Sequence, residues 1–408
     1  MSNTNNADCN YQPLPATKLI HSARDSQNYA GCVNNPLFAT STIVFDSFES
    51  FIKADNDKEI SPNKIYYGRY GSKTNTDCQE LIAKIYDCDF AKITSNGHSA
   101  NVIAILAFVK SGDEILINDN AYYPTRHLAK ELDERFGIKA KIYNPFNIDS
   151  IKAMVSDKTK VVFVENPGSL TFETCDIQEI SKAVKAKNPQ IKVIADNTFA
   201  TPLHHNPLKF GADVAVDSAT KFFLGLSEYM CGSLAYNKQD ALAIEQSFRL
   251  LAPMASPVAA HACLKGLRSL GARLKAHTDT FNYVVPELKK HPKVQQIIHP
   301  SISCTMGHEN YKKYFSGAAS VFSLSLKRLY SDAELAKFFN SLKFFGLGYS
   351  YGGYESLAIP FPKSLQSIRT CGMPAFTNTS NIRIYLGLED KQDLLNDLLN
   401  ALNKGLTD

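Results

Sequence analysis

The order of apolar and polar segments between residues 76 and 221 limits the fold more than any other feature of this chain. Short β-rich runs recur there, and each one leads into a polar loop: AKIT, EILIN, VVFVE, KVIAD and VAVD. Between them lie segments with the apolar spacing of amphipathic helices, such as residues 77–86 and the segment that begins near residues 95–99. This alternation predicts a mostly parallel central sheet with helices on both faces.

The length of 408 residues allows two or three domains. After about residue 257 the sequence becomes more helical, and the runs ASVFSLSL, FGLGYSYGGYES and NIRIYLGL then predict short strands before a last helix. Residues 1–65 are polar but contain enough apolar side chains to pack on the body or on another subunit. We therefore expect an N-terminal arm at 1–70, an α/β domain at 71–260 and a smaller α+β domain at 261–408.

Several classes of protein are disfavoured by charge, hydropathy and cysteine spacing. A net charge of +4 without basic clusters argues against a nucleic-acid partner. The longest apolar run, residues 102–109, is too short to cross a bilayer, and no secretory signal is visible at the N-terminus. Nine cysteines without a CxxC pair fit neither a disulfide framework nor a zinc site. We expect a cytoplasmic protein with reduced thiols, no membrane contact and no metal.

Two residues at the ends of β-rich runs could carry chemistry. Lys221 follows VAVD in the segment Ser218-Ala219-Thr220-Lys221, where burial would lower the pKa of its amine and make it nucleophilic. The hydroxyls of Ser218 and Thr220 could hold a phosphate, although a surface lysine is the plainer interpretation. Asp196 ends the run KVIAD, where its carboxylate would be buried and would need a partner. The alternative interpretation is that Asp196 caps the N-terminus of a helix. A pyridoxal phosphate (PLP) site requires two such residues. One is a lysine that forms a Schiff base with the cofactor, and the other is an aspartate that pairs with the protonated nitrogen of the pyridine ring.

These segments resemble the signature of the PLP-dependent enzymes of cysteine and methionine metabolism, which include cystathionine β-lyases, γ-synthases and γ-lyases and methionine γ-lyases. The motif residues are 195–202 (ADNTFATP) and 218–221 (SATK), followed by Gly225. The resemblance extends from about Leu19 to the C-terminal helix. It implies PLP as cofactor and the fold of the PLP-dependent transferases (aspartate aminotransferase-like, fold type I), with Lys221 as the Schiff-base lysine and Asp196 at the ring nitrogen.

The resemblance also implies residues that bind the cofactor phosphate. Tyr67 and Arg69 match an arm element that reaches the cofactor of the neighbouring subunit in relatives, and a planar guanidinium suits a phosphate. An exposed loop arginine is the alternative for Arg69. Gly97 and His98 match a turn whose backbone N–H groups bind phosphate at a helix N-terminus, with His98 in place of the usual methionine.

Further residues are implied at the cofactor ring and the substrate. Tyr122 matches the tyrosine that stacks on the ring, with core packing as the alternative, and Tyr122 and Tyr67 are the candidate catalytic phenols beside Lys221. Arg383 matches the arginine that binds the substrate α-carboxylate in a fork-to-fork contact. The plainer interpretation of Arg383 is a surface pair with Glu389 or Asp390.

The reaction within the family is suggested by residues 349–356, YSYGGYES, which resemble the bacterial cystathionine β-lyases and place Ser350 and Tyr351 at the substrate. The implied reaction is β-elimination of L-cystathionine to homocysteine, pyruvate and ammonia, in methionine biosynthesis. A γ-acting lyase, synthase or sulfhydrylase remains open, as does a non-catalytic relative, because Leu226 and Glu228 replace a usual His and Asp. Relatives are homotetramers, each a pair of dimers, and their substrates are amino acids.

Overall fold

The computed structural model describes residues 13–56, 64–362 and 378–406, so residues 1–12 and 57–63 of the expected arm lie outside it. Its larger sheet has seven strands in the order β1-β7-β6-β5-β4-β2-β3. All neighbouring pairs are parallel except those of β7, which runs antiparallel to β1 and β6. A mostly parallel sheet is therefore present, and β3 and β7 are additions to the expected strands. The strands are β1 (Phe90–Thr94), β2 (Glu114–Asn118), β3 (Lys139–Tyr143), β4 (Thr159–Glu165), β5 (Lys192–Asp196), β6 (Val214–Asp217) and β7 (Gly232–Tyr236).

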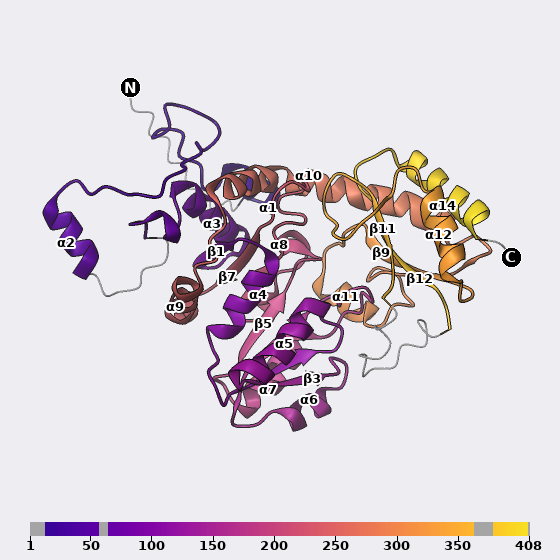
Figure 1. Cartoon of the computed structure of the whole chain (residues 1–408), viewed down its shortest axis with the longest axis horizontal. Coiled ribbons are helices and arrows are strands. Elements are labelled where there is room, and N and C mark those ends of the chain that lie inside the picture. Colours follow the sequence, from indigo (N-terminus) through magenta and orange to yellow (C-terminus); the bar gives the residue numbers. More distant parts are fainter. Residues whose placement is uncertain (1–12, 57–63, 363–377, 407–408) are drawn as a thin grey trace.

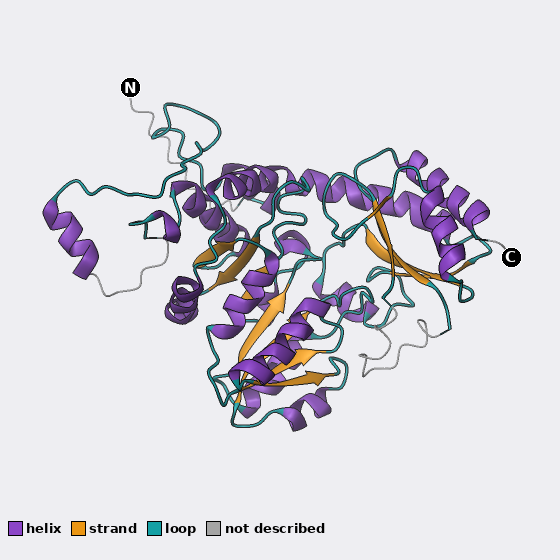
Figure 2. Cartoon of the chain, in the orientation of Figure 1, coloured by secondary structure: helices purple, strands orange, loops and turns teal. Residues whose placement is uncertain are grey.

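Helices cover both faces of this sheet, as Figure 2 shows. One face packs on α4 (Gly97–Leu106), α5 (Tyr123–Phe136) and α9 (Ala241–Leu251). The opposite face packs on α3 (Lys73–Tyr86), α6 (Ile148–Met154), α7 (Ile177–Lys187) and part of α10 (Pro257–Leu288). Successive residues of β6 alternate between the faces, since Val214 and Val216 join the first cluster and Ala215 joins the second. Short helices lie in the connections: α8 (Thr201–His204), η2 (Pro207–Phe210) and η3 (Lys238–Asp240).

The C-terminal part is built on a second sheet of five strands, in the order β10-β11-β12-β9-β8. Its pairs are antiparallel apart from β10 with β11. The long helix α10 contains the expected boundary between residues 260 and 261 and runs from the first sheet to the second (Figure 1). The elements are β8 (Val294–Ile298), α11 (His308–Tyr314), β9 (Val321–Leu326), α12 (Asp332–Ser341), β10 (Gly346–Leu347), β11 (Leu357–Pro360), β12 (Asn381–Tyr385) and α14 (Lys391–Gly405).

One expected strand, FGLGYSYGGYES, is mostly a loop. Only Gly346–Leu347 pairs as a strand, and the chain then bends away. The reason is in the backbone, because Ser350 has φ 93° and Gly352 has φ 89°, which lie outside the β region. This bend carries the following residues toward the edge of the larger sheet.

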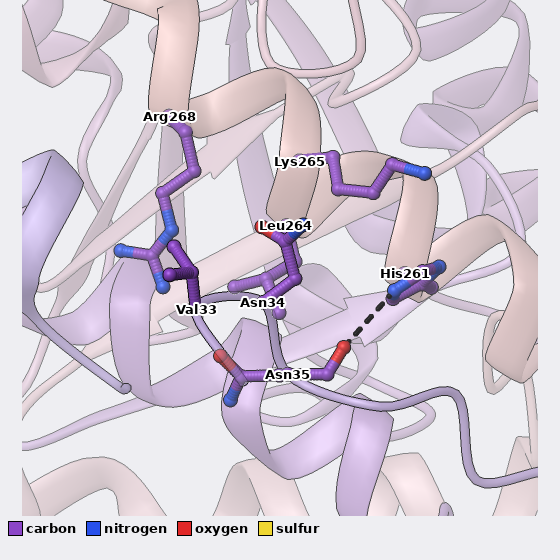
Figure 3. A pocket seen from close by; sticks show the side chains of 7 residues that line it. All are labelled: Val33, Asn34, Asn35, His261, Leu264, Lys265 and Arg268. Atoms are coloured by element: carbon purple, nitrogen blue, oxygen red, sulfur yellow. Dashed lines mark hydrogen bonds between the residues drawn. The ribbon is translucent and has the colours of Figure 1, made fainter. Parts of the chain in front are cut away.

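The described part of the arm contains α1 (Pro15–His21), α2 (Phe48–Asn56) and η1 (Gly68–Tyr70). Figure 3 shows where its first loop crosses α10: His261 Nε2 is 3.2 Å from the Asn35 carbonyl oxygen, next to the side chains of Lys265 and Arg268. Beyond this loop α2 stands away from the body in Figure 1, with Phe48 72% exposed. No helix in the described ranges is long and apolar enough to cross a membrane.

Candidate functional site

The ends of β5 and β6 bring the two expected chemical residues to the same edge of the larger sheet. Asp196 at the end of β5 pairs with Val216 on β6, and Lys221 follows β6 after a short turn. The N-terminus of α4 meets this turn, since a Cβ placed on Gly97 would lie 2.6 Å from Ser218 Cβ. Only glycine fits so close an approach, so the Gly97 turn and the Lys221 turn form one continuous site.

Lys221 is half-buried and lies among polar and aromatic side chains rather than on the open surface. Its Nζ donates a hydrogen bond of 2.7 Å to Ser350 Oγ and lies 5.1 Å from the ring centroid of Tyr351. Burial and the charge of Arg383 lower the pKa of Lys221 to about 8, while Asp196 acts in the opposite direction. The amine is still mostly protonated at pH 7, but its neutral, nucleophilic fraction is much larger than that of an ordinary lysine.

The loop after β10 is fitted against the Lys221 backbone. A Cβ on Gly352 would lie 2.7 Å from the carbonyl carbon of Lys221, and its φ of 89° is itself a glycine conformation. Ser350 takes a similar φ of 93° despite its side chain, which is strained. This strained position directs the hydroxyl of Ser350 to Lys221 and its carbonyl to Arg383.

Asp196 is a buried acceptor with a complete set of donors at one oxygen. Its Oδ1 accepts hydrogen bonds from the Thr198 backbone N–H at 3.0 Å and the Thr198 hydroxyl at 2.6 Å. Its Oδ2 accepts from Asn101 Nδ2 at 3.3 Å, and burial raises the pKa of the carboxyl. The alternative of a helix N-cap does not apply, because the next helix begins at Thr201 with Ala200 as its cap.

Two of these supporting residues, Thr198 and Asn101, are not among the candidates that the sequence suggests. Thr198 also accepts a 2.7 Å hydrogen bond from the Ser218 backbone N–H, so it links the turn of Asp196 to the turn of Lys221. Thr198 lies within the recognised motif and could have been considered. Asn101 lies about one helical turn after Gly97 and carries no motif signal of its own.

Arg383 on β12 faces the same pocket. Its Nη2 donates to the Ser350 carbonyl at 2.7 Å, and its buried Nε has no hydrogen-bond partner within the described residues. The surface pairs considered above are not made: Glu389 accepts from Ser356, and Asp390 caps α14. A buried guanidinium with an unused N–H group is suited to an incoming carboxylate.

Tyr122 lies at the open side of the pocket and is 52% exposed. Burial of its phenol and the nearby Glu165 and Asp196 raise its pKa, whereas Arg383 lowers it. Its backbone N–H donates to Glu165 Oε2 at 2.6 Å, which fixes the start of α5. Glu165 is a further residue that the sequence interpretation did not single out.

The candidate phosphate-binding residues lie in two places: Thr220 and His98 lie beside the Lys221 and Gly97 turns, whereas Tyr67 and Arg69 lie on the arm. The hydroxyl of Thr220 donates to the Cys231 carbonyl at 3.0 Å and accepts from the Cys231 N–H at 2.9 Å, so it braces the turn. Partial burial and His127 lower the pKa of His98 beside the Gly97 turn. The contacts of Tyr67 and Arg69 are with the arm, where the guanidinium lies 5.7 Å from the ring centroid of Tyr67 and 5.1 Å from that of Tyr70.

The chemical character of this pocket fits pyridoxal phosphate. It combines an amine of lowered pKa, a buried carboxyl, an exposed phenol, an arginine with a free N–H group and a helix N-terminus. The amine and the carboxyl are the pair that this cofactor needs. Across the described ranges, no three His, Cys, Asp or Glu side chains gather as a metal site would require.

Comparisons with known proteins give concordant matches over almost the whole chain. A family model described as Cys/Met metabolism PLP-dependent enzyme matches residues 16–403. The chain is 32% identical over 383 residues to the cystathionine beta-lyase of Salmonella typhimurium, covering 94% of this chain and 96% of the relative. It is 33% identical over 394 residues to the L-alanine/L-glutamate racemase of Wolbachia pipientis wMel, with the same two coverages of 94% and 96%.

A solved structure with a similar fold is the cystathionine gamma synthase from Xanthomonas oryzae pv. oryzae in complex with aminoacrylate and cysteine. The TM-score is 0.87 at 25% sequence identity, and the match covers 97% of this chain and 99% of that chain. Relatives that differ in reaction therefore share both the sequence pattern and the chain path.

Proposed function

Because the chain belongs to the family of PLP-dependent enzymes of cysteine and methionine metabolism, we propose that it is a cystathionine β-lyase. Membership confirms the expected family, fold type I and PLP as cofactor, and it supports a PLP-dependent carbon–sulfur lyase. The choice of reaction within the family is our proposal: β-elimination of L-cystathionine releases homocysteine, and one water then converts the remaining three-carbon fragment to pyruvate and ammonia.

The observation that carries this choice is the loop of residues 349–356. It resembles the β-lyase segment in sequence, and it lies against Lys221, to which it supplies the Ser350 hydroxyl and the Tyr351 ring. The same loop accepts the Arg383 hydrogen bond at the Ser350 carbonyl. A segment that resembles the β-lyases in sequence is thus in direct contact with the reacting amine in this chain.

The residues of the pocket divide the work as follows. Lys221 would hold PLP and then, as a free amine of lowered pKa, remove the proton from the substrate Cα. PLP supplies an electron sink for the Cα carbanion. Asp196 would keep the ring nitrogen protonated, and Arg383 would orient the substrate through its α-carboxylate. Lys221 or Tyr122 would give a proton to the leaving thiolate, and Tyr67 of a neighbouring subunit would assist at Cα.

Product identification tests the proposed reaction. Protein with the visible absorbance of bound PLP is incubated with L-cystathionine, and the products are separated by mass spectrometry. Pyruvate with homocysteine is expected. Formation of 2-oxobutyrate with cysteine would instead assign a γ-lyase, and absence of all four products would favour a synthase, a sulfhydrylase or a non-catalytic relative.

A second candidate function is racemisation, which the match to the Wolbachia pipientis enzyme favours. Racemisation and β-elimination begin with the same removal of the Cα proton, which Lys221 would perform here. They differ in whether a leaving group departs from Cβ, and L-alanine has none. Incubation with L-alanine and chiral chromatography separates the two functions, since D-alanine forms only if the carbanion is reprotonated on its other face.

The assembly is part of the proposal. We place the enzyme in the cytoplasm as a homotetramer, with amino acids as substrates and with Tyr67 and Arg69 of each subunit completing the site of a partner. Apolar side chains exposed on the arm support a contact between the arm and a partner subunit. Among them are Phe48, Phe51 and Val44, which is 86% exposed.

Subunit mixing tests the shared site. Arg69→Ala and Lys221→Ala proteins should each be inactive, but their hybrid dimers would contain one site with both defects and one intact site. Equal mixing after reversible dissociation should therefore restore about one quarter of wild-type activity. Arg135→Ala is the control, because Arg135 is exposed and pairs with Glu131 at 2.5 Å; this variant should be fully active alone. A mixture that stays inactive would place Arg69 in its own subunit's site.

A further inference from the structure

A buried carboxyl beneath the Lys221 turn has no part in the reaction described above. Asp217 ends β6 and is 2% exposed. The hydroxyl of Tyr86 donates to its Oδ2 at 2.7 Å, and the Ser233 hydroxyl lies 3.4 Å from the same oxygen. Its Oδ1 is also buried and has no hydrogen-bond partner among the described residues. Such a group is costly unless it is neutral or paired.

The same tyrosine connects Asp217 to the turn after β5. Asn197 Nδ2 donates to the Tyr86 hydroxyl at 3.0 Å and to the His205 carbonyl at 2.8 Å. The Asn197 backbone N–H donates to the Val216 carbonyl at 2.8 Å. Because Asn197 follows Asp196 directly, one phenol on α3 links the turn that carries Asp196 to the strand end that leads to Lys221.

The surroundings of Asp217 favour its protonated form. Burial raises the pKa of Asp217 to about 8, the charge of Asp196 adds to this, and hydrogen bonds from Tyr86 and Ser233 oppose it. The groups that face Asp217 are Tyr86 on α3, Ser233 on β7, Asp196 on β5 and Cys263 on α10, and none of these four is a cation. These surroundings favour the protonated carboxyl of Asp217 at pH 7.

We propose that Asp217 is a positioning residue that acts as a neutral carboxylic acid and holds the Asp196 and Lys221 turns together through Tyr86. Ionisation would strengthen the hydrogen bond from Tyr86, but it would also place a buried negative charge, with Oδ1 unpaired among the described residues, beside Asp196. This uncompensated charge would displace the two turns. The inference rests on the family's use of Lys221 and Asp196 to hold PLP, and it is independent of whether the substrate loses its β or its γ substituent.

Infrared titration of the apoprotein tests the neutral state directly. Between about pH 6 and about pH 10, wild-type protein should lose a carboxylic acid C=O band with a midpoint near pH 8, and Asp217→Asn should lack that component. Asp176→Asn is a matched control, because Asp176 also accepts a tyrosine hydrogen bond, from Tyr314 at 2.6 Å. Burial would raise the pKa of Asp176, but bonds from Tyr314, the Glu179 N–H and Lys313 outweigh it and lower the pKa. The control should therefore keep the wild-type band; a wild-type spectrum without the band would overturn the proposal.

Tyr86→Phe keeps the inference testable if Asp217→Asn folds poorly. Loss of the Tyr86 hydroxyl removes a hydrogen bond that lowers the pKa of Asp217, so the midpoint of the infrared titration should move to higher pH. Affinity for PLP should fall about ten-fold in Tyr86→Phe, the size of one lost buried hydrogen bond. An unchanged or lower midpoint would contradict a link between Tyr86 and the protonated carboxyl.

The pH dependence of PLP affinity separates positioning from mere structural support. Asp217→Asn mimics the neutral acid, so it should bind PLP within about three-fold of wild type at pH 7 and lose less affinity above pH 8.

The stability of the apoprotein gives a second readout. Because the folded carboxyl keeps a proton that the unfolded chain releases, wild type should lose stability relative to Asp217→Asn as the pH rises toward about 8. Identical pH profiles in the two proteins would overturn the inference.

Discussion

Replacement of Lys221 with alanine is expected to lower kcat for L-cystathionine by at least about 10⁴-fold, since one group serves as both nucleophile and general base. The amine is pre-set for these roles by burial and by Arg383, which lower its pKa to about 8, and by a 2.7 Å hydrogen bond to Ser350. Initial-rate kinetics with detection of pyruvate measure the loss. The visible absorbance of covalently held PLP should disappear in the same variant.

Lys185→Ala is the control for this experiment. Lys185 is a lysine that donates a hydrogen bond to a carboxylate, Asp213 at 3.0 Å, but it lies on α7 and is partly exposed. It should keep wild-type turnover, and circular dichroism should show that both variants fold. Retained turnover in Lys221→Ala would remove the catalytic assignment, while a wild-type protein without activity to lose would indicate the non-catalytic relative.

Local sequence patterns predicted the alternating strands and helices of the larger sheet and the polar residues at the ends of its strands. Asp196 and Lys221 could be singled out as candidates because Asp196 ends one short apolar strand and Lys221 follows the next. The carboxyl ends of these neighbouring parallel strands meet at one edge. Strand β7 was missed because its sequence, GSLAY, is buried on both faces and contains small residues that show neither alternation nor strong β-propensity.

The remaining parts of the site depend on long-range contacts that a local pattern does not contain. The aromatic segment of residues 349–356 resembles a strand, but contact between Gly352 and the Lys221 backbone forces it into a bend with positive φ values. Asn101 reaches Asp196 only because α4 packs beside β5. The Tyr86–Asp217 hydrogen bond joins residues far apart in the sequence and likewise leaves no local signal.

Replacement of Arg383 with lysine is expected to lower kcat/KM by about a hundred-fold, mainly through KM, which corresponds to about one charge-assisted hydrogen bond. The guanidinium already uses Nη2 to hold the Ser350 carbonyl, and its buried Nε, which has no partner in the part of the chain that the structure describes, can bind the substrate α-carboxylate. A lysine ammonium cannot maintain both contacts in the same plane. Arg135→Lys, an exposed replacement on α5, should leave kcat/KM unchanged.

A substrate lacking the charged group distinguishes carboxylate binding from support of the Lys221 loop. The α-carboxamide of cystathionine should react slowly with wild-type enzyme, but the Arg383→Lys change should then cost less than about three-fold, because the two alterations remove the same interaction. If Arg383 instead acts only by holding Ser350 beside Lys221, the variant would lose kcat rather than affinity, and the loss would be equal for both substrates. Equal losses would therefore reassign Arg383 as a positioning residue for the reacting amine.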